Sequence, residues 1–284
     1  MKETYNEQMA LLTDNTKCIG CRGCQVACKQ WHNLPAEKTE FFGGPGYQNP
    51  SKLSCSTFTL IHYHEKVENE ELKDWAFYKE QCRHCIEPAC VSACLVKALE
   101  KLPNGAVVYH DDLCMGCRYC MIACPYEIPK FEYHKPIPLI QKCDFCYDRI
   151  EEGLKPACAQ TCPSDAILYG ERGELIKEAQ KRISNNPEKY VDHIYGEHEV
   201  GGTNVMCISS VPLEKFGIKT NVGTASIPSY TKPFLSAVPV VIIGGAAVCT
   251  AFHWIAKRRD ELTKAEMKDL KESVETKEKK EDNS

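Results

Sequence analysis

The stretch "DDLCMGCRYCMIACPYEIP", residues 111–129, holds four cysteines at spacings of three, three and four, with a proline directly after the last. Nearly the same phrase occurs near the N-terminus, where "NTKCIGCRGCQVACK" spans residues 15–29. Closely spaced thiols of this kind are typical of metal sites, because a tight turn can direct neighbouring sulfurs at one centre. The chain therefore contains at least two copies of a compact thiolate motif.

The other cysteines extend this pattern to a double repeat. Of the 19 cysteines in 284 residues, three are scattered, namely Cys55, Cys207 and Cys249. The remaining sixteen form four groups, which in chain order are group one, Cys18, Cys21, Cys24, Cys28; group two, Cys82, Cys85, Cys90, Cys94; group three, Cys114, Cys117, Cys120, Cys124; and group four, Cys143, Cys146, Cys158, Cys162. Groups one and three share the phrase CxGCRxCxxAC, whereas groups two and four share P-A-C before the last cysteine. The order A, B, A, B predicts two related units.

The spacing favours iron-sulfur clusters over the alternatives. CxxCxxC directs three thiolates at one centre, and a fourth cysteine before proline ligates the neighbouring cluster, as in bacterial ferredoxins. A structural zinc site is usually built from two separated CxxC pairs, and cysteines three apart are poor disulfide partners. Sixteen ligands at four per cluster predict four 4Fe-4S clusters. Lys29 and Leu95 replace the expected proline after Cys28 and Cys94, which we interpret as a local change of backbone.

The sequence alone leaves the pairing of the groups open. Only nineteen residues separate Cys94 from Cys114, which suits a two-cluster unit made from groups two and three and leaves groups one and four for the other unit. Residues 29–81 form an insertion in which "STFTLIHYH" (56–64) and "DWAFYKE" (74–80) predict a β-hairpin.

The remaining elements predict an α+β fold in which a four-cluster domain spans residues 1–170. Short strands are expected at "GAVVYH" and "AILYG". In the connecting segment 171–233, "GELIKEAQKRI" predicts a helix, and "YGEHEVGGTNVMCISSVP" predicts a loop that leads into a short strand. Residues 234–256 carry no charge and predict a transmembrane helix, followed by a charged helical tail at 257–284.

The membrane segment carries further expectations. Gly244 to Ala247 are small residues that favour close approach of a partner helix over a simple anchor. Residues 256–275 hold six Lys and Arg against three in 214–233, which predicts a cytoplasmic tail and an extracytoplasmic cluster domain in the inner membrane. His253 is a candidate for contact with a quinone or haem edge, although beside Trp254 a hydrogen bond at the bilayer surface is the stronger interpretation.

Composition and motifs exclude other classes. The net charge of −4 and the absence of a basic stripe with interleaved aromatics argue against a nucleic-acid partner. No GxGxxG, P-loop or nucleophile-base set is present, so we expect a non-catalytic electron conduit. The N-terminus has no secretory or twin-arginine signal, so we expect export of the folded domain bound to a partner that carries one.

With these features the chain resembles the iron-sulfur β subunits of membrane-bound formate dehydrogenases and the iron-sulfur subunit of periplasm-facing nickel-iron hydrogenases. The resemblance covers residues 13–256 and rests on the cysteine order, "CRYCMIACPYEIPKF", "YGEHEVGGTNVM" and "FHW". It implies two ferredoxin-like two-cluster modules, one from groups one and four and one from groups two and three, with a hairpin insertion and a single C-terminal transmembrane helix.

The resemblance also implies the ligands of each cluster. They are set I, Cys18, Cys21, Cys24, Cys162; set II, Cys28, Cys143, Cys146, Cys158; set III, Cys82, Cys85, Cys90, Cys124; and set IV, Cys94, Cys114, Cys117, Cys120.

The implied partners are a catalytic subunit, either a molybdenum or tungsten pterin formate dehydrogenase or a hydrogenase, and a membrane cytochrome b or other quinone-reactive subunit. Two alternatives are a subunit of a quinol-dependent reductase, in which electrons flow the other way, and a zinc-stabilised scaffold.

Overall fold

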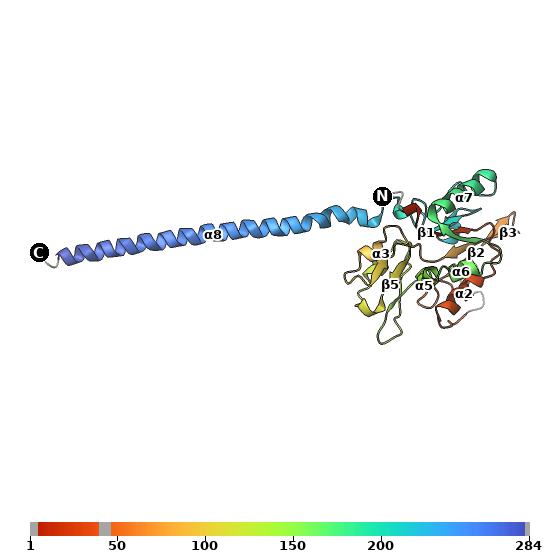
Figure 1. Cartoon of the computed structure of the whole chain (residues 1–284), viewed down its shortest axis with the longest axis horizontal. Helices are drawn as coiled ribbons and strands as arrows, with labels where there is room; N and C mark the ends of the chain where they lie inside the picture. Colours follow the sequence, from red (N-terminus) through yellow and green to blue (C-terminus); the bar gives the residue numbers. More distant parts are fainter. Residues whose placement is uncertain (1–4, 40–46, 282–284) are drawn as a thin grey trace. The chain divides into compact units, whose positions relative to one another are not determined.

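The computed structural model describes residues 5–39 and 47–281. Residues 40–46, which are part of the predicted insertion 29–81, and the outermost ends of the chain, 1–4 and 282–284, lie outside the described residues. The chain divides into two compact units, Met1–Ser229 and Tyr230–Ser284. The first unit contains the cysteine groups, and the second consists of most of one long helix, α8 (Figure 1).

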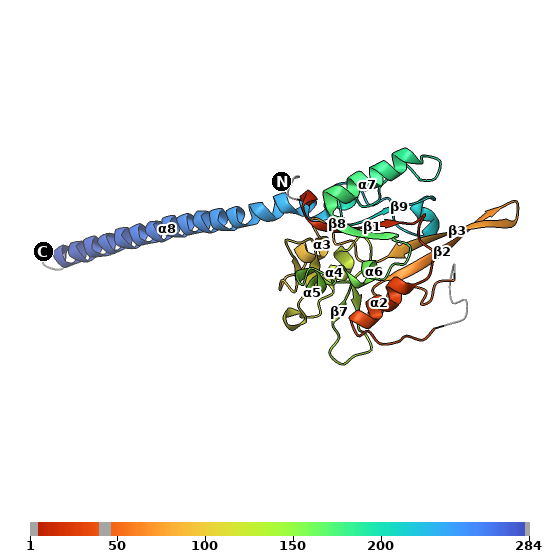
Figure 2. The ribbon, with the colours of Figure 1, turned by 45° about the vertical axis from the view of Figure 1, so that its right-hand side comes forward.

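A three-stranded sheet lies at the centre of the first unit, in the order β8-β1-β9 (Figure 2). Strand β1 (Met9–Asp14) pairs antiparallel with β8 (Ile167–Glu171) and parallel with β9 (Val205–Ile208). The sequence predicted strands at the positions of β8 and β9. It predicted none at β1, which joins the two.

The reason is that β1 is buried on both faces. Leu11 packs in a core cluster with Cys24 and Phe145, whereas Leu12 faces the opposite cluster around helix α7. A strand covered on both sides has no polar alternation to reveal it. Because β1 touches both clusters, it joins the cysteine-bearing part of the unit to α7.

Helix α7 (Arg172–Asn185) matches the helix predicted at 173–183. It turns Leu175, Ala179 and Ile183, spaced four apart, toward β1. Arg182 of this helix donates to the fully buried Asp14 carboxylate at 2.8 Å and to Glu178 at 2.8 Å.

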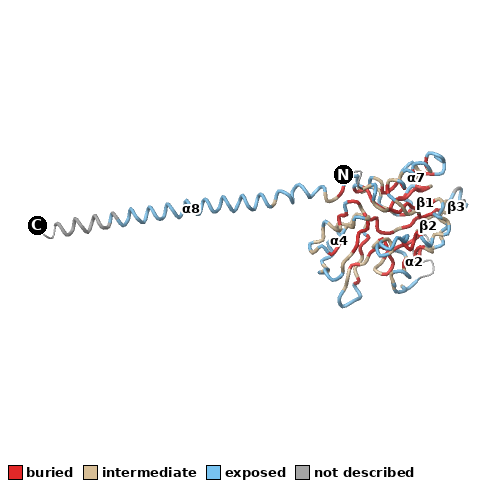
Figure 3. The backbone as a smooth tube through the Cα atoms, viewed as in Figure 1, coloured by how far each residue is buried: buried red, intermediate tan, exposed pale blue. Residues whose placement is uncertain are grey.

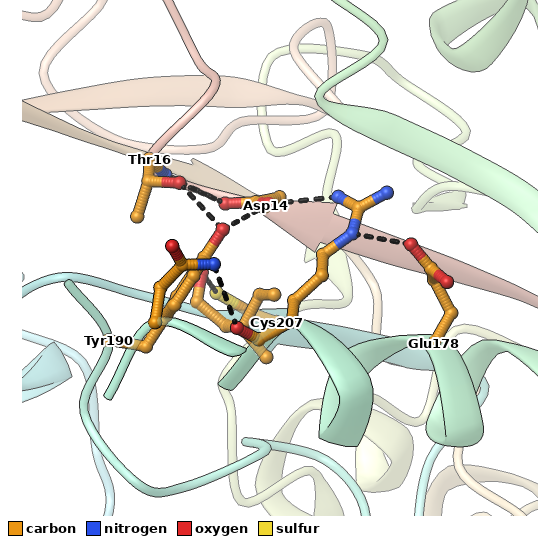
Figure 4. A network of polar contacts seen from close by, with 8 residues as sticks. Asp14, Thr16, Glu178, Tyr190 and Cys207 are labelled. Atoms are coloured by element: carbon orange, nitrogen blue, oxygen red, sulfur yellow. Dashed lines mark hydrogen bonds and ion pairs between the residues drawn. The ribbon is translucent and has the colours of Figure 1, made fainter. Parts of the chain in front are cut away.

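The same carboxylate of Asp14 accepts hydrogen bonds from the hydroxyls of Thr16 and Tyr190, at 2.7 Å and 3.0 Å (Figure 4). With Arg182, three side chains therefore satisfy a charge at the end of the central strand. This network ties β1 to α7 and to the segment after it.

Strands β2 (Leu60–Glu68) and β3 (Glu71–Glu80) pair antiparallel, as their sequence pattern predicted. Tyr63 and Phe77 are register partners whose rings meet edge to face at 5.2 Å. Cross-strand aromatic pairs of this kind stabilise a hairpin.

The two sequence repeats produce two kinds of short helix. Helices α2 (Gly23–Trp31) and α4 (Tyr119–Ala123) follow the CxGCR turns, while α3 (Ala89–Ser92) and α6 (Ala157–Gln160) begin at the P-A-C phrases. Helix α2 contacts α6, and α3 contacts α4. Contacts between helices therefore join group one to group four and group two to group three.

Smaller elements complete the first unit. They are the strand pair β4 (Leu99–Lys101) and β5 (Val107–Tyr109), the strand pair β6 (Lys130–Phe131) and β7 (Ile140–Gln141), helix α5 (Tyr147–Glu151), and the 3-10 turns η1 (Asp111–Leu113), η2 (Glu199–Gly201) and η3 (Leu213–Phe216).

Helix α8 (Ile227–Glu281) contains the predicted membrane segment 234–256 and continues through the charged tail. It is the one helix among the described residues that is long and apolar enough to cross a membrane. Its residues up to Lys268 are almost all exposed, whereas the buried residues are concentrated in the first unit (Figure 3). At 1.5 Å per residue the uncharged segment is about 34 Å long, enough for a hydrocarbon core of about 30 Å.

Candidate iron-sulfur sites

The turns of groups one and three have the same backbone. Gly20 and Gly116 have φ of 66° and 71°, and Arg22 and Arg118 have φ of 61° and 64° before the helices begin. A Cβ on Gly20 would lie 2.7 Å from the ring of Phe77, so glycine is required there by space as well as by conformation. The shared phrase CxGCR therefore encodes one repeated turn.

Four cysteines line one small cavity beside the first of these turns. Cys18, Cys21 and Cys24 come from group one, and Cys162 from group four. Burial raises the pKa of Cys18, and Cys162 and Cys21 raise it further. The four sulfurs of set I are therefore close neighbours around one space.

A second small cavity is lined by Cys28 of group one together with Cys143, Cys146 and Cys158 of group four. Leu11, Phe145 and Pro156 provide apolar walls. Burial raises the pKa of Cys28 to about 12, and the neighbouring Cys158 contributes to the rise. These are the four cysteines of set II.

The cysteines of sets III and IV are also neighbours. Burial raises the pKa of Cys85 well above its usual value, and Cys82, Cys124 and Cys90 add to the effect. Burial likewise raises the pKa of Cys120 to about 11, with contributions from Cys114, Cys117 and Cys94. Each set thus draws one cysteine from a different group than the other three.

The spacing of the sulfurs suits a cluster better than a single ion. A zinc ion about 2.3 Å from each thiolate brings four sulfurs within roughly 3.8 Å of one another. Among the described residues, the one metal-compatible group whose ligand atoms all lie within 4.8 Å is His32, Asp144 and Cys146, and it contains a single cysteine. The cysteine sulfurs among the described residues are therefore spaced too widely for one zinc ion, which favours a larger group such as a 4Fe-4S cluster.

Two histidines reach the sulfurs of set II. His84 is 1% exposed, and its Nε2 lies 3.5 Å from Cys143 Sγ. Its Nδ1 accepts the Val107 N–H at 2.9 Å, so the ring hydrogen of a neutral His84 lies on Nε2 and is directed at the sulfur. His32 Nε2 lies 3.6 Å from Cys146 Sγ. Sequence reasoning missed both histidines, and the only signal for His84 is its position between two cysteines in "CRHC".

The segment "YGEHEVGGTNVM" binds the turn of group two through backbone hydrogen bonds. The N–H of Asn204 contacts the carbonyls of Arg83 and His84 at 3.2 Å, and Val205 donates to Arg83 at 3.1 Å. Gly202 (φ 97°) packs so closely that a Cβ there would lie 2.8 Å from Ile86. The segment therefore anchors the CxxC turn to strand β9.

The three remaining cysteines belong to none of the four sets. Cys207 is buried in β9, Cys55 is half-buried, and Cys249 is exposed on α8. His253 is also exposed on α8.

Comparisons with known proteins agree with this chemistry. Residues 73–172, which span groups two, three and four, match the family model described as a 4Fe-4S dicluster domain.

Among similar proteins, one from Nitratidesulfovibrio vulgaris (strain Hildenborough) is 41% identical over 92% of this chain and 70% of its own length. The hydrogenase-2 operon protein HybA of Escherichia coli O157:H7 is 35% identical over 74% of this chain and 72% of its own. The iron-sulfur subunit of the nitrate-inducible formate dehydrogenase of Escherichia coli K12 is 36% identical over 72% and 69%. The chain belongs to the family of iron-sulfur proteins that comprises the iron-sulfur subunits of formate dehydrogenases and the hydrogenase-2 protein HybA.

Proposed function

We propose that this chain is a non-catalytic electron-transfer subunit that binds four 4Fe-4S clusters, one in each of the sets I to IV. The observation that carries the proposal is the exchange of one cysteine between groups in every set, which gives each cavity or cysteine neighbourhood four sulfur donors. Exchange of this kind is how two-cluster ferredoxins hold their clusters side by side.

Cysteines of successive sets are neighbours. Cys24 of set I lies near Cys158 of set II, Cys143 of set II near Cys82 of set III, and Cys90 of set III near Cys120 of set IV. This supports a relay in the order I, II, III, IV. We therefore infer that sets I and IV are its two ends.

Exposure of the ligands supports the same order. Cys21 of set I and Cys117 of set IV are the exposed cysteines of the four sets. Apolar side chains are exposed beside each, Ile19 near Cys21 and Met115 near Cys117. An electron entering from one protein and leaving to another needs such ends close to the surface.

The residues of this chain would hold the clusters through cysteine sulfurs, set the distances between them and exclude water from their surroundings. When bound, 4Fe-4S clusters accept and release single electrons at potentials tuned by hydrogen bonds and exposure. Apolar walls such as Ile61 and Ile167 at set I and Phe145 at set II exclude solvent. Potential differences between the sets then depend on the polar groups that reach each one.

We infer a catalytic partner of the formate dehydrogenase or hydrogenase type at one end and a quinone-reactive membrane subunit, such as a cytochrome b, at the other. The names of the relatives support the first partner. The apolar helix α8 supports a membrane partner and a single-pass location.

Iron and acid-labile sulfide analysis tests the proposal. We expect four of each for every set of four cysteines, together with broad absorption near 400 nm. Cys85→Ser is expected to lower the iron content by removing a ligand of set III, whereas Cys55→Ser, outside all sets, is expected to leave it unchanged. A colourless, zinc-containing protein would contradict the proposal.

A further inference from the structure

Strand β3 carries a lysine to the wall of the set I cavity. Lys79 and its register partner Ile61 both line that cavity. Two residues earlier on the same face of the strand, Phe77 packs against the Gly20 turn of group one. The hairpin therefore holds Lys79 in a defined place beside the cysteines.

The ammonium group of Lys79 is buried without a protein partner. The residue is 3% exposed, and its Nζ has no hydrogen-bond acceptor within the part of the chain that the structure describes. Two other lysines near the cysteines differ in this respect. Lys101 donates to the carbonyls of His84 and Gly105 at 3.1 Å and 2.8 Å, and Lys142 donates to the carbonyl of Cys143 at 2.9 Å.

An isolated buried ammonium is costly, so a charge of opposite sign is required nearby. Among the described residues, Lys79 forms no ion pair with a carboxylate. Cys24 of set I and Cys158 of set II pack in one core cluster with Ile61, the register partner of Lys79. Two residues along the chain, Gln81 lines the set II cavity, so this part of the hairpin lies beside both sets.

We propose that the Lys79 ammonium is a fixed positive charge beside the clusters of sets I and II, and that it raises the reduction potential of both. The inference rests on the proposed function. Reduction adds a negative charge to a site that already carries four thiolates, and a cation at short range in a poorly screened interior favours that charge. The β2–β3 hairpin would then serve to deliver this cation.

The experiment compares Lys79→Met with the wild type, using the full chain in detergent and a redox titration followed by electron paramagnetic resonance. The expected result is that two of the four clusters become harder to reduce, each by at least tenfold in the equilibrium constant. For a one-electron couple this equals a fall of about 59 mV. The other two clusters keep their potentials and act as an internal reference.

Two further variants complete the design. Lys66→Met removes a partly exposed lysine of the same hairpin, paired with Asp74 at 3.0 Å, and is expected to change no potential. Lys79→Arg keeps the charge and is expected to retain iron and near-native potentials.

Unchanged potentials in an iron-replete Lys79→Met protein would overturn the proposal. If Lys79→Met loses iron, the Lys79→Arg variant distinguishes the two explanations. Iron retained by Lys79→Arg supports a requirement for positive charge. Loss of iron from both variants shows that the shape of the lysine side chain matters instead and overturns the proposal. A wild-type chain without cluster signals would refute the proposed function itself, which is a separate outcome.

Discussion

His84 links two of the cysteine sets through a single side chain. Its backbone belongs to the CxxC turn of group two, between Cys82 and Cys85 of set III, while its ring reaches Cys143 of set II. Burial lowers the pKa of His84 well below its usual value, and the nearby Lys142 and Lys101 lower it further. The imidazole is therefore neutral and offers one N–H, whose direction the Val107 amide determines.

Replacing His84 by Phe keeps a ring of similar size but removes both hydrogen bonds. We expect the set II cluster to lose an N–H donor to sulfur and to fall in reduction potential, because such bonds stabilise the reduced form. The unpaired Val107 amide is expected to cost about 1–3 kcal/mol of unfolding free energy. Redox titration and urea unfolding measure the two effects. The exposed His198→Phe serves as a control, and equal effects in both variants would contradict the role of His84.

At the scale of elements, α7 is held to the central strand by charge as well as by apolar packing. Asp14 is fully buried, and its carboxylate depends on Arg182 for a counter-charge. The apolar face Leu175, Ala179 and Ile183 contributes the rest of the contact. Because β1 carries core residues on both faces, loosening α7 is expected to disturb the cysteine-bearing side as well.

Arg182→Met leaves the buried Asp14 charge without its cation. Breaking a buried pair by removing one partner costs about 3–5 kcal/mol, so we expect a loss of that order in unfolding free energy. Urea unfolding of the full chain in detergent, followed by near-ultraviolet circular dichroism, measures it. Lys177→Met removes an exposed ion pair with Glu174 on the same helix and is expected to change stability by about 0.5 kcal/mol or less. A similarly small effect of Arg182→Met would contradict the stabilising role of the Arg182–Asp14 ion pair.

At the scale of the whole molecule, the asymmetry of charge around the apolar part of α8 predicts its orientation. Lys257, Arg258 and Arg259 follow directly after the uncharged segment, whereas Lys232 is the nearest basic residue before it. Basic residues next to a membrane helix favour the cytoplasmic side. We infer that the cluster-binding unit faces away from the cytoplasm.

Protease treatment of spheroplasts tests this orientation. Externally added protease is expected to cleave the cluster-binding unit, whereas an epitope placed after Ser284 stays protected until the membrane is opened. Changing Lys257, Arg258 and Arg259 to Gln is expected to increase the fraction of inverted chains, because it removes the basic flank. Resistance of the cluster-binding unit to external protease would contradict the assignment.

The sequence alone determined the chemistry and several of the longer elements. Cysteine spacing, the repeated turns and an uncharged run of 23 residues are local properties, so iron-sulfur binding and an apolar helix at 234–256 follow from them directly. The hairpin β2–β3 and helix α7 also follow, because their periodicity shows which face is buried.

Only the tertiary structure decided which side chains meet across long stretches of chain. Strand β1 has no alternating pattern because both of its faces are covered, and the central sheet could not be foreseen without it. Lys79 and His84 read as ordinary polar residues in sequence. They become significant because the fold buries them beside cysteines from groups far away in the chain. Solvent does not reach these positions, so a buried ammonium or N–H depends on the groups next to it.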